Sequence, residues 1–201
     1  MCAPNVEDMS HNSEWAEQVA RELLEEPLPR RWAHSQGVAA QAASLAGIVG
    51  EHADLITAAA WLHDIGYSPA IAHTGFHPLD GARYLRDVRR ADTRLCRLVA
   101  HHSCAAIEAE ERGLAEVLLA EFEPERPELT DALTYCDMTT GPDGRHLTVD
   151  ERLAEIRTRY GRGHVVERSI ERATPRIKKS ARLVHGWRRC YPMTGVPEFA
   201  R

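Results

Sequence analysis

Apolar residues recur at every third or fourth position along most of this chain, with polar residues between them. That spacing is typical of amphipathic α-helices, because residues three and four apart share one helix face. The clearest such row consists of Ile170, Ala173, Ile177, Ala181 and Val184. No segment alternates apolar and polar residues over a useful strand length, so the pattern predicts an all-α fold.

Prolines, glycines and capping residues divide the pattern into separate helices. Thr148, with Glu151 three residues later, carries a capping-box signature for the start of one of them. Gly66 is expected to end the helix before it, and the acidic segment 107–113 is expected to be exposed. We expect helices over residues 12–26, 30–48, 52–64, 92–103, 114–122, 128–140, 148–160 and 165–187, and one that begins at His77.

These helices fit one domain, since 201 residues can bury a sizeable core. We expect the single-domain helical bundle to cover residues 12–189, after a flexible leader over 1–11 and before an irregular tail over 190–201. The hydrophobic share of 43% and the charged share of 27% are ordinary for a soluble protein. A net charge of −5 provides no positive surface for nucleic acid or anionic membranes, so neither partner is expected.

The cysteines and the N-terminus indicate the compartment. Five scattered cysteines without a CxxC pair support neither a zinc ribbon nor a disulfide framework. Residues 1–15 contain no apolar segment of the kind found in signal peptides, and residues 32–50 are too polar for a membrane span. We therefore expect a cytoplasmic protein with reduced thiols.

Several of the eleven histidines stand on or beside apolar helix faces, as do two aspartates. Isolated polar groups on such faces are costly unless they are paired or bound to metal. Imidazoles and carboxylates together compose sites for first-row transition metals. The candidate metal ligands are His34, His63, Asp64, His77, His101, His102 and Asp137.

Each candidate also has an ordinary structural interpretation. A lone histidine such as His34 is commonly hydrogen-bonded in a core, and His77 before proline could cap a helix. The pair His101-His102 could face solvent at a helix end, and Asp137 could be a salt-bridge partner. Singly, these residues do not decide between structure and chemistry.

Their order along the chain does. A histidine, an adjacent His-Asp pair and a distant aspartate occur as His34, His63-Asp64 within LHDIGY, and Asp137 within ALTYCDMTT. Over about residues 32–140 the chain resembles the HD superfamily of metal-dependent phosphohydrolases. The resemblance implies that these four residues hold a first metal ion.

HD proteins with two metals add histidines between the His-Asp pair and the last aspartate, where this chain has HPLDGARYL and VAHHS. The resemblance implies a second ion held by Asp64, His77 and His101, with His102 as a further ligand or phosphate contact. Asp64, which could bridge both ions, is the candidate catalytic residue. Mn or Fe is the expected metal, with Zn, Ni, Co or Mg as other candidates. The chain lacks the Gly-Tyr-Pro of the HD-GYP branch, so cyclic dinucleotide hydrolysis is not expected.

By this resemblance we expect hydrolysis of a phosphate ester of a small, nucleotide-like substrate by a metal-bound hydroxide. Two alternatives remain open, a di-iron oxygenase of the HD type and a non-catalytic nucleotide sensor. His73 could contact substrate or be an exposed loop residue, and Arg30 and Arg31 could hold a phosphate. The basic residues Lys178 and Lys179 fit a solvated helix face better than a site.

Overall fold

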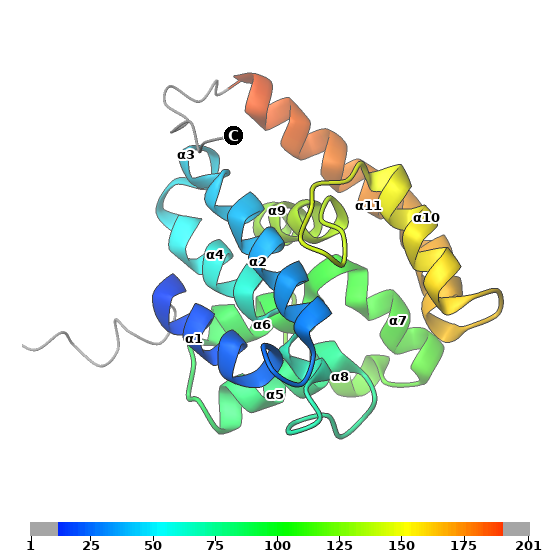
Figure 1. Ribbon diagram of the computed structural model, residues 1–201. Helices are drawn as coiled ribbons and strands as arrows, with labels where there is room; N and C mark the ends of the chain where they lie inside the picture. The colour runs from blue at the N-terminus through cyan, green and yellow to red at the C-terminus, as the bar shows by residue number, and fades with distance from the viewer. Residues whose placement is uncertain (1–11, 191–201) are drawn as a thin grey trace, which may run out of the picture.

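The structure is a computed structural model that describes residues 12–190, and within this range all extended regular structure is helical (Figure 1). The prediction of an all-α fold is confirmed. The expected leader and the tail from residue 191 lie outside the described residues. The helices are α1 (Ser13–Leu24), α2 (Pro29–Ala43), α3 (Ala46–Val49), α4 (Ala53–Leu62), α5 (His77–Asp87), α6 (Thr93–His101), α7 (Ala105–Arg112), α8 (Ala115–Glu121), α9 (Pro127–Met138), α10 (Val149–Tyr160) and α11 (Val165–Cys190).

Helix α4 lies in the middle of the bundle, packed against α1 and α2 (Figure 1). Its sequence ADLITAAAWL is apolar on nearly every side, as expected of an interior helix. Its buried alanines allow neighbouring helices to approach closely, and Leu55, Ile56 and Leu62 fill the remaining core space. This packing brings the C-terminal end of α4 to the centre of the molecule.

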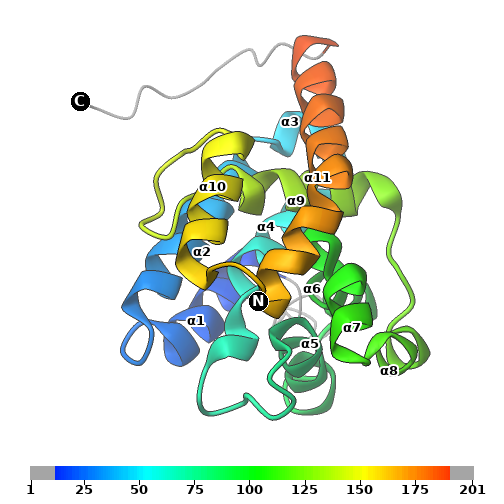
Figure 2. The same ribbon diagram turned by 90° about the vertical axis from the view of Figure 1, so that its right-hand side faces the viewer.

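Helices α10 and α11 lie side by side across the outside of this bundle (Figures 1 and 2). The predicted capping box starts α10, since the Glu151 amide donates to the Thr148 hydroxyl while the Glu151 carboxylate accepts from the Thr148 amide. Beneath the two helices is a second hydrophobic cluster, distinct from the main core. It consists of Met138, Leu153, Ile156, Val166, Ala173 and Ile177.

The helix expected over residues 30–48 is broken in two, so that prediction was wrong at its C-terminal end. The Ser44 hydroxyl donates to the Gln41 carbonyl, and the Leu45 amide bonds to the Ala42 carbonyl as in a 3-10 turn. Arg188 of α11 also donates to the Ser44 hydroxyl. These bonds compete with the regular helical ladder, so α2 ends at Ala43 and the short α3 follows.

Two further boundaries differ from the sequence-based expectation. The helix expected over residues 52–64 ends at Leu62, before a 3-10 turn over Ile65–Tyr67. The acidic segment expected to be exposed forms most of α7, which buries Ala105 and Ala109. Of its acids, Glu110 is exposed, whereas Glu108 and Glu111 are only partly exposed. One small buried residue per turn is enough to pack this helix against its neighbours. The sequence pattern of apolar residues is therefore weak here.

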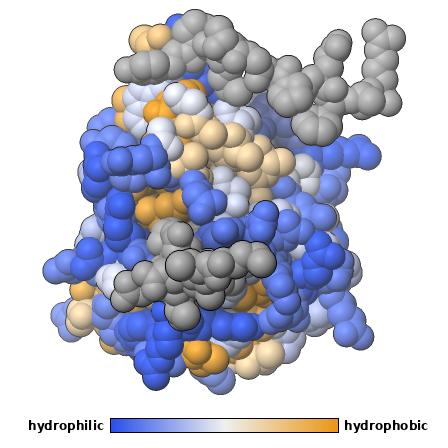
Figure 3. All heavy atoms as spheres, turned by 90° about the vertical axis from the view of Figure 1, so that its left-hand side faces the viewer, coloured by the Kyte–Doolittle hydropathy of each residue, from blue (hydrophilic) through white to orange (hydrophobic). Residues whose placement is uncertain are grey.

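The surface is mostly hydrophilic on the face shown in Figure 3, with apolar residues in small groups. Among residues 12–190 the large hydrophobic side chains that remain exposed are Val88, Val117, Leu119 and Leu183. No helix in the same range is long and apolar enough to cross a membrane.

Candidate metal centre

The early end of α4 places His63 and Asp64 in one buried site. Their exposed fractions are 0% and 3%. On a continuing helix these neighbours would point about 100° apart. Because the chain tightens after Leu62, His63 Nε2 instead lies 3.5 Å from Asp64 Oδ2.

His34 of α2 and Asp137 of α9 complete a first group around this pair. His34 Nε2 lies 2.9 Å from Asp137 Oδ1 and 3.9 Å from Asp64 Oδ2. His63 Nε2 lies 4.0 Å from Asp137 Oδ1. Donor atoms of His34, His63 and Asp64 all fall within 4.8 Å of one another, so this group could hold a metal ion.

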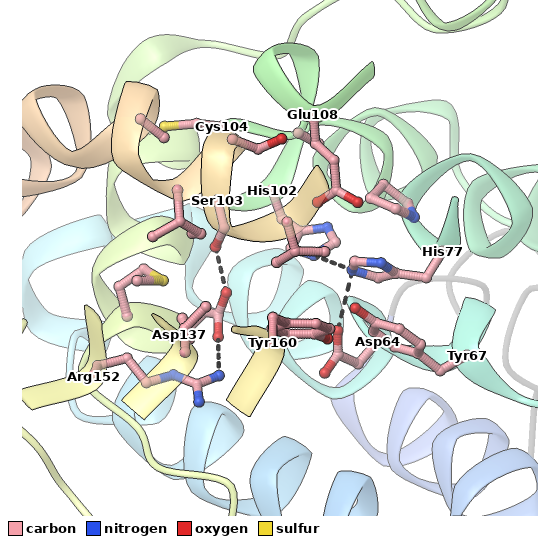
Figure 4. Close-up of a pocket in the computed structure, with 18 of the residues that line it drawn as sticks. Asp64, Tyr67, His77, His102, Ser103, Cys104, Glu108, Asp137, Arg152 and Tyr160 are labelled. Carbon is pink, nitrogen blue, oxygen red and sulfur yellow. Dashed lines mark hydrogen bonds and ion pairs between the residues drawn. The ribbon is translucent and has the colours of Figure 1, made fainter. Parts of the chain in front are cut away.

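A second group contains Asp64, His77 and His102, again with donor atoms within 4.8 Å of one another. His77 opens α5, and its Nε2 lies 3.3 Å from Asp64 Oδ1 and 3.1 Å from His102 Nε2. Figure 4 shows the His77 ring between these two residues. The two groups therefore share Asp64, which turns Oδ2 to the first and Oδ1 to the second.

His101 does not join either group, contrary to the expectation that it rather than His102 would be the main ligand. Its Nε2 lies 2.7 Å from the Phe122 carbonyl. Since a carbonyl only accepts, that nitrogen carries the proton and has no lone pair for a metal. The structure exchanges the positions expected of the two neighbouring histidines, since His102 and not His101 lies beside Asp64 and His77.

A left-handed turn after His102 makes this exchange possible. Ser103 and Cys104 have φ values of 48° and 64°, an uncommon conformation for residues other than glycine. The turn ends α6 and brings the Ser103 hydroxyl onto Asp137 Oδ2. Such strain persists only where the surrounding structure enforces it, and it often marks functional sites.

Three histidines of the two groups are oriented in the same way. His34 Nδ1 lies 3.0 Å from the Gly141 carbonyl, and His63 and His102 make the corresponding bond of 2.7 Å to the carbonyls three residues before them. Each Nδ1 must donate to its carbonyl, so Nε2 is the nitrogen that faces the carboxylates and that can bind a metal once it carries no proton. Metal-ligating histidines are held by backbone carbonyls in this manner.

The donor set fits a divalent metal. His63 Nε2 is buried and has no hydrogen-bond partner among residues 12–190. An unsatisfied buried polar atom costs about 1–3 kcal/mol, so its retention needs a reason. A cation between this lone pair and the carboxylates of Asp64 and Asp137 provides one.

The electrostatics keep both carboxylates charged and disfavour protonation of His77 and His102. Burial opposes ionisation of Asp64, but Arg31 and the neighbouring histidines outweigh it and hold the pKa of Asp64 well below its usual range. The hydrogen bond from His34 and the nearby positive charges likewise overcome burial and lower the pKa of Asp137. Burial lowers the pKa of both His77 and His102. Anionic carboxylates and neutral imidazoles are the protonation states that bind metal.

Arg31 is part of the site, in a way that the sequence does not show. Its guanidinium lies 2.5 Å from Asp64 Oδ2 and sits over the Tyr67 ring at 3.8 Å. Tyr67 in turn stacks on His77 with ring centroids 3.9 Å apart. Burial raises the pKa of Tyr67 well above its usual value, so its hydroxyl is neutral. This stack fixes the plane of the His77 ring.

A pocket opens onto these residues, and α10 and α11 supply its far side (Figure 4). Ile156, Val166 and Ala173 of the second hydrophobic cluster form an apolar wall. Arg152 points toward Asp137 with Nη2 3.6 Å from Oδ1 (Figure 4). Sequence reasoning missed Arg152, although its place four residues before Ile156 puts it on an apolar helix face.

The remaining candidates lie away from this pocket. His73 is exposed, and only its backbone amide is used, as a donor to Asp80. It fits the interpretation as an exposed loop residue rather than a substrate contact. Lys178 pairs with Asp150 at the surface, in agreement with the expected solvated face of the last helix.

The sequence matches the HD domain family over residues 31–140, more than half of the chain and nearly the stretch singled out by its histidines and aspartates. No curated protein and no solved structure matches the chain. HD domains bind divalent metals through histidine and aspartate side chains, and both metal-compatible groups have members within the matched stretch. The chain therefore belongs to the HD domain family, whose members are generally metal-dependent phosphohydrolases.

Proposed function

We propose that the protein hydrolyses a phosphate ester of a small, nucleotide-like substrate at a centre of two divalent metal ions. The observation that carries the proposal is the sharing of Asp64 between two groups of donor atoms. His34, His63, Asp64 and Asp137 would hold one ion, and Asp64, His77 and His102 the other. Bound there, divalent metals would neutralise phosphate oxygens and activate a water molecule as nucleophile.

The residues around the groups suit a phosphorylated substrate. Arg31 and Arg152 present guanidinium groups to the pocket, and guanidinium forms charge-assisted hydrogen bonds with phosphate. The apolar wall of Ile156, Val166 and Ala173 excludes water from one side and provides contact area for an organic moiety. Tyr67 stacks on His77, and backbone carbonyls hold the other imidazoles in place.

The test begins with metal analysis of protein purified without chelators. We expect Mn or Fe to be bound, and the metal-loaded protein to release phosphate or alcohol from members of a phosphoester panel. Treatment with a chelator should abolish turnover and lower the melting temperature, because metal bound only to the folded state stabilises it. A loaded protein that is inactive on the whole panel would contradict the proposal. Mixed-valence iron with substrate-dependent O₂ uptake would identify an oxygenase instead.

The neighbouring histidines provide a matched comparison. His102→Ala should remove the ion of the second group and leave that of the first, because only His102 turns Nε2 toward Asp64 and His77. His101→Ala should keep both ions and lose about 1 kcal/mol of stability with its hydrogen bond to Phe122. Metal content per folded protein checks both variants. Loss of an ion in His101→Ala with full occupancy in His102→Ala would reverse the assignment.

A further inference from the structure

A hollow next to the metal-compatible groups is lined by four arginines and by no acidic residue. Its lining residues are Arg30, Arg31, His34, Pro142, Arg152 and Arg159. The chain as a whole is acidic, with a net charge of −5. Concentrating like charges is unfavourable unless carboxylates or a bound anion compensate for them.

The carboxylates near the hollow compensate for the arginines only in part. Arg31 pairs with Asp64, and Arg152 approaches Asp137 at 3.6 Å. Both of these aspartates also belong to the proposed metal centre, so a divalent cation would share their charge. Glu155 remains, and it serves two arginines at once: Arg152 at 2.6 Å and Arg159 at 3.4 Å.

Arg152 supplies a second, independent sign of a missing anionic partner. The residue is 3% exposed, and its Nε has no hydrogen-bond partner among residues 12–190. Guanidinium groups have five donors and no acceptor, so a buried donor of this kind needs an oxygen from elsewhere. The hydrogen-bonding geometry of a phosphate group matches it.

The hollow adjoins the pocket described above and shares three lining residues with it. Arg31, Arg152 and Arg159 line both of them, so an anion held by these arginines lies beside the proposed reaction centre. Arg152 and Arg159 belong to α10, which follows the stretch matched by the HD domain family. Two of the four arginines of the hollow therefore come from a helix outside the matched stretch, and the other two come from α2.

We propose that this arginine hollow binds a second phosphate group of the substrate, separate from the one that is hydrolysed. The substrate class is then a small organic bisphosphate or diphosphate. The assignment of the hollow to a substrate rests on the proposed phosphohydrolase function, whereas binding of the anion can be measured without turnover. One phosphate would occupy the hollow while the apolar wall contacts the organic moiety.

The test is calorimetric titration of the full-length protein with inorganic pyrophosphate, as purified and again after removal of metal with a chelator. Arg30→Gln and Arg159→Gln remove exposed arginines of the hollow, and Arg157→Gln is the control because Arg157 is exposed on the same helix outside the hollow. We expect about tenfold weaker pyrophosphate binding in the first two variants, because each loses a charge-assisted contact. The control should bind pyrophosphate as tightly as the parent protein. The difference should persist in the metal-free protein.

The outcomes separate this site from the proposed function. Equal affinity in all four proteins, or binding that disappears with the metal, would overturn the arginine site. Arginine-dependent binding by a protein that hydrolyses no phosphoester would leave the anion site standing while the proposed function fails. If hydrolysis occurs, the arginine variants should raise KM for bisphosphates more than for monophosphates. An unchanged KM ratio would count against the second phosphate.

Discussion

Asp64→Ala is expected to leave the protein without metal in either group and to lower phosphoester hydrolysis by at least about a hundredfold, since even the outer partners of metal ligands contribute 10–100-fold. Asp64 offers one carboxylate oxygen to each group, so its removal affects both at once. Elemental analysis of the folded variant checks the first expectation. The number of metal ions lost per protein distinguishes Asp64 from the other proposed ligands, because each of those belongs to a single group.

The same substitution also leaves the Arg31 guanidinium without its carboxylate. Arg31 is mostly buried, with 18% of its side chain exposed, and breaking such a pair costs up to about 3 kcal/mol. Asp64→Asn keeps the volume and one oxygen, so it shows how much metal is lost through charge alone. Asp150→Asn, an exposed aspartate on α10, should keep its metal and its activity. Full occupancy of both groups in Asp64→Ala would refute the bridging role.

Gly66→Ala is expected to destabilise the protein by about 3 kcal/mol or more, which corresponds to a melting temperature lower by roughly 6–12 °C. A Cβ atom at this position would lie 2.0 Å from the His77 carbonyl oxygen and 2.7 Å from the Gly81 nitrogen. Both are backbone atoms of α5, so neither can turn aside. The shift of α5 that relieves the overlap would move His77, and metal in the second group should fall as well.

Gly47→Ala provides the control, because a Cβ at that exposed position meets no atom within 4 Å. Its melting temperature should stay the same or rise slightly, since alanine favours helix by up to about 1 kcal/mol over glycine. Thermal unfolding of both variants, with metal analysis, measures the difference. If Gly66→Ala melts with the parent protein, the close approach of η3 (Ile65–Tyr67) and α5 is not as tight as described.

Gly66 is important to the structure, but for a different reason from the one that its sequence context suggests. From the sequence it reads as a helix terminator, yet α4 ends before it, at Leu62. Its role is to let the backbone of α5 approach, and that contact involves a helix that begins eleven residues later. A local pattern of residues carries no information about which distant backbone comes within van der Waals distance.

The histidine pair shows the same limit at the metal centre. His101 and His102 are identical in type and adjacent, so spacing does not decide which of them turns inward. The left-handed conformations of Ser103 and Cys104 direct His102 to Asp64, while the Phe122 carbonyl takes the Nε2 proton of His101. Arg152 was missed for a related reason, because its importance depends on α10 folding back over Asp137.

The all-α class, most helix positions and the order of histidines and aspartates that marks an HD domain can be read from the amino-acid sequence. Helical periodicity and motif order are local properties of the chain. Three features emerge from the folded arrangement alone: which Nε2 atoms face Asp64, the pairing of Arg31 with Asp64, and the closure of the pocket by arginines and an apolar wall from α10 and α11. Those features depend on where helices end and how they rotate against one another. Packing between residues far apart in the chain sets both.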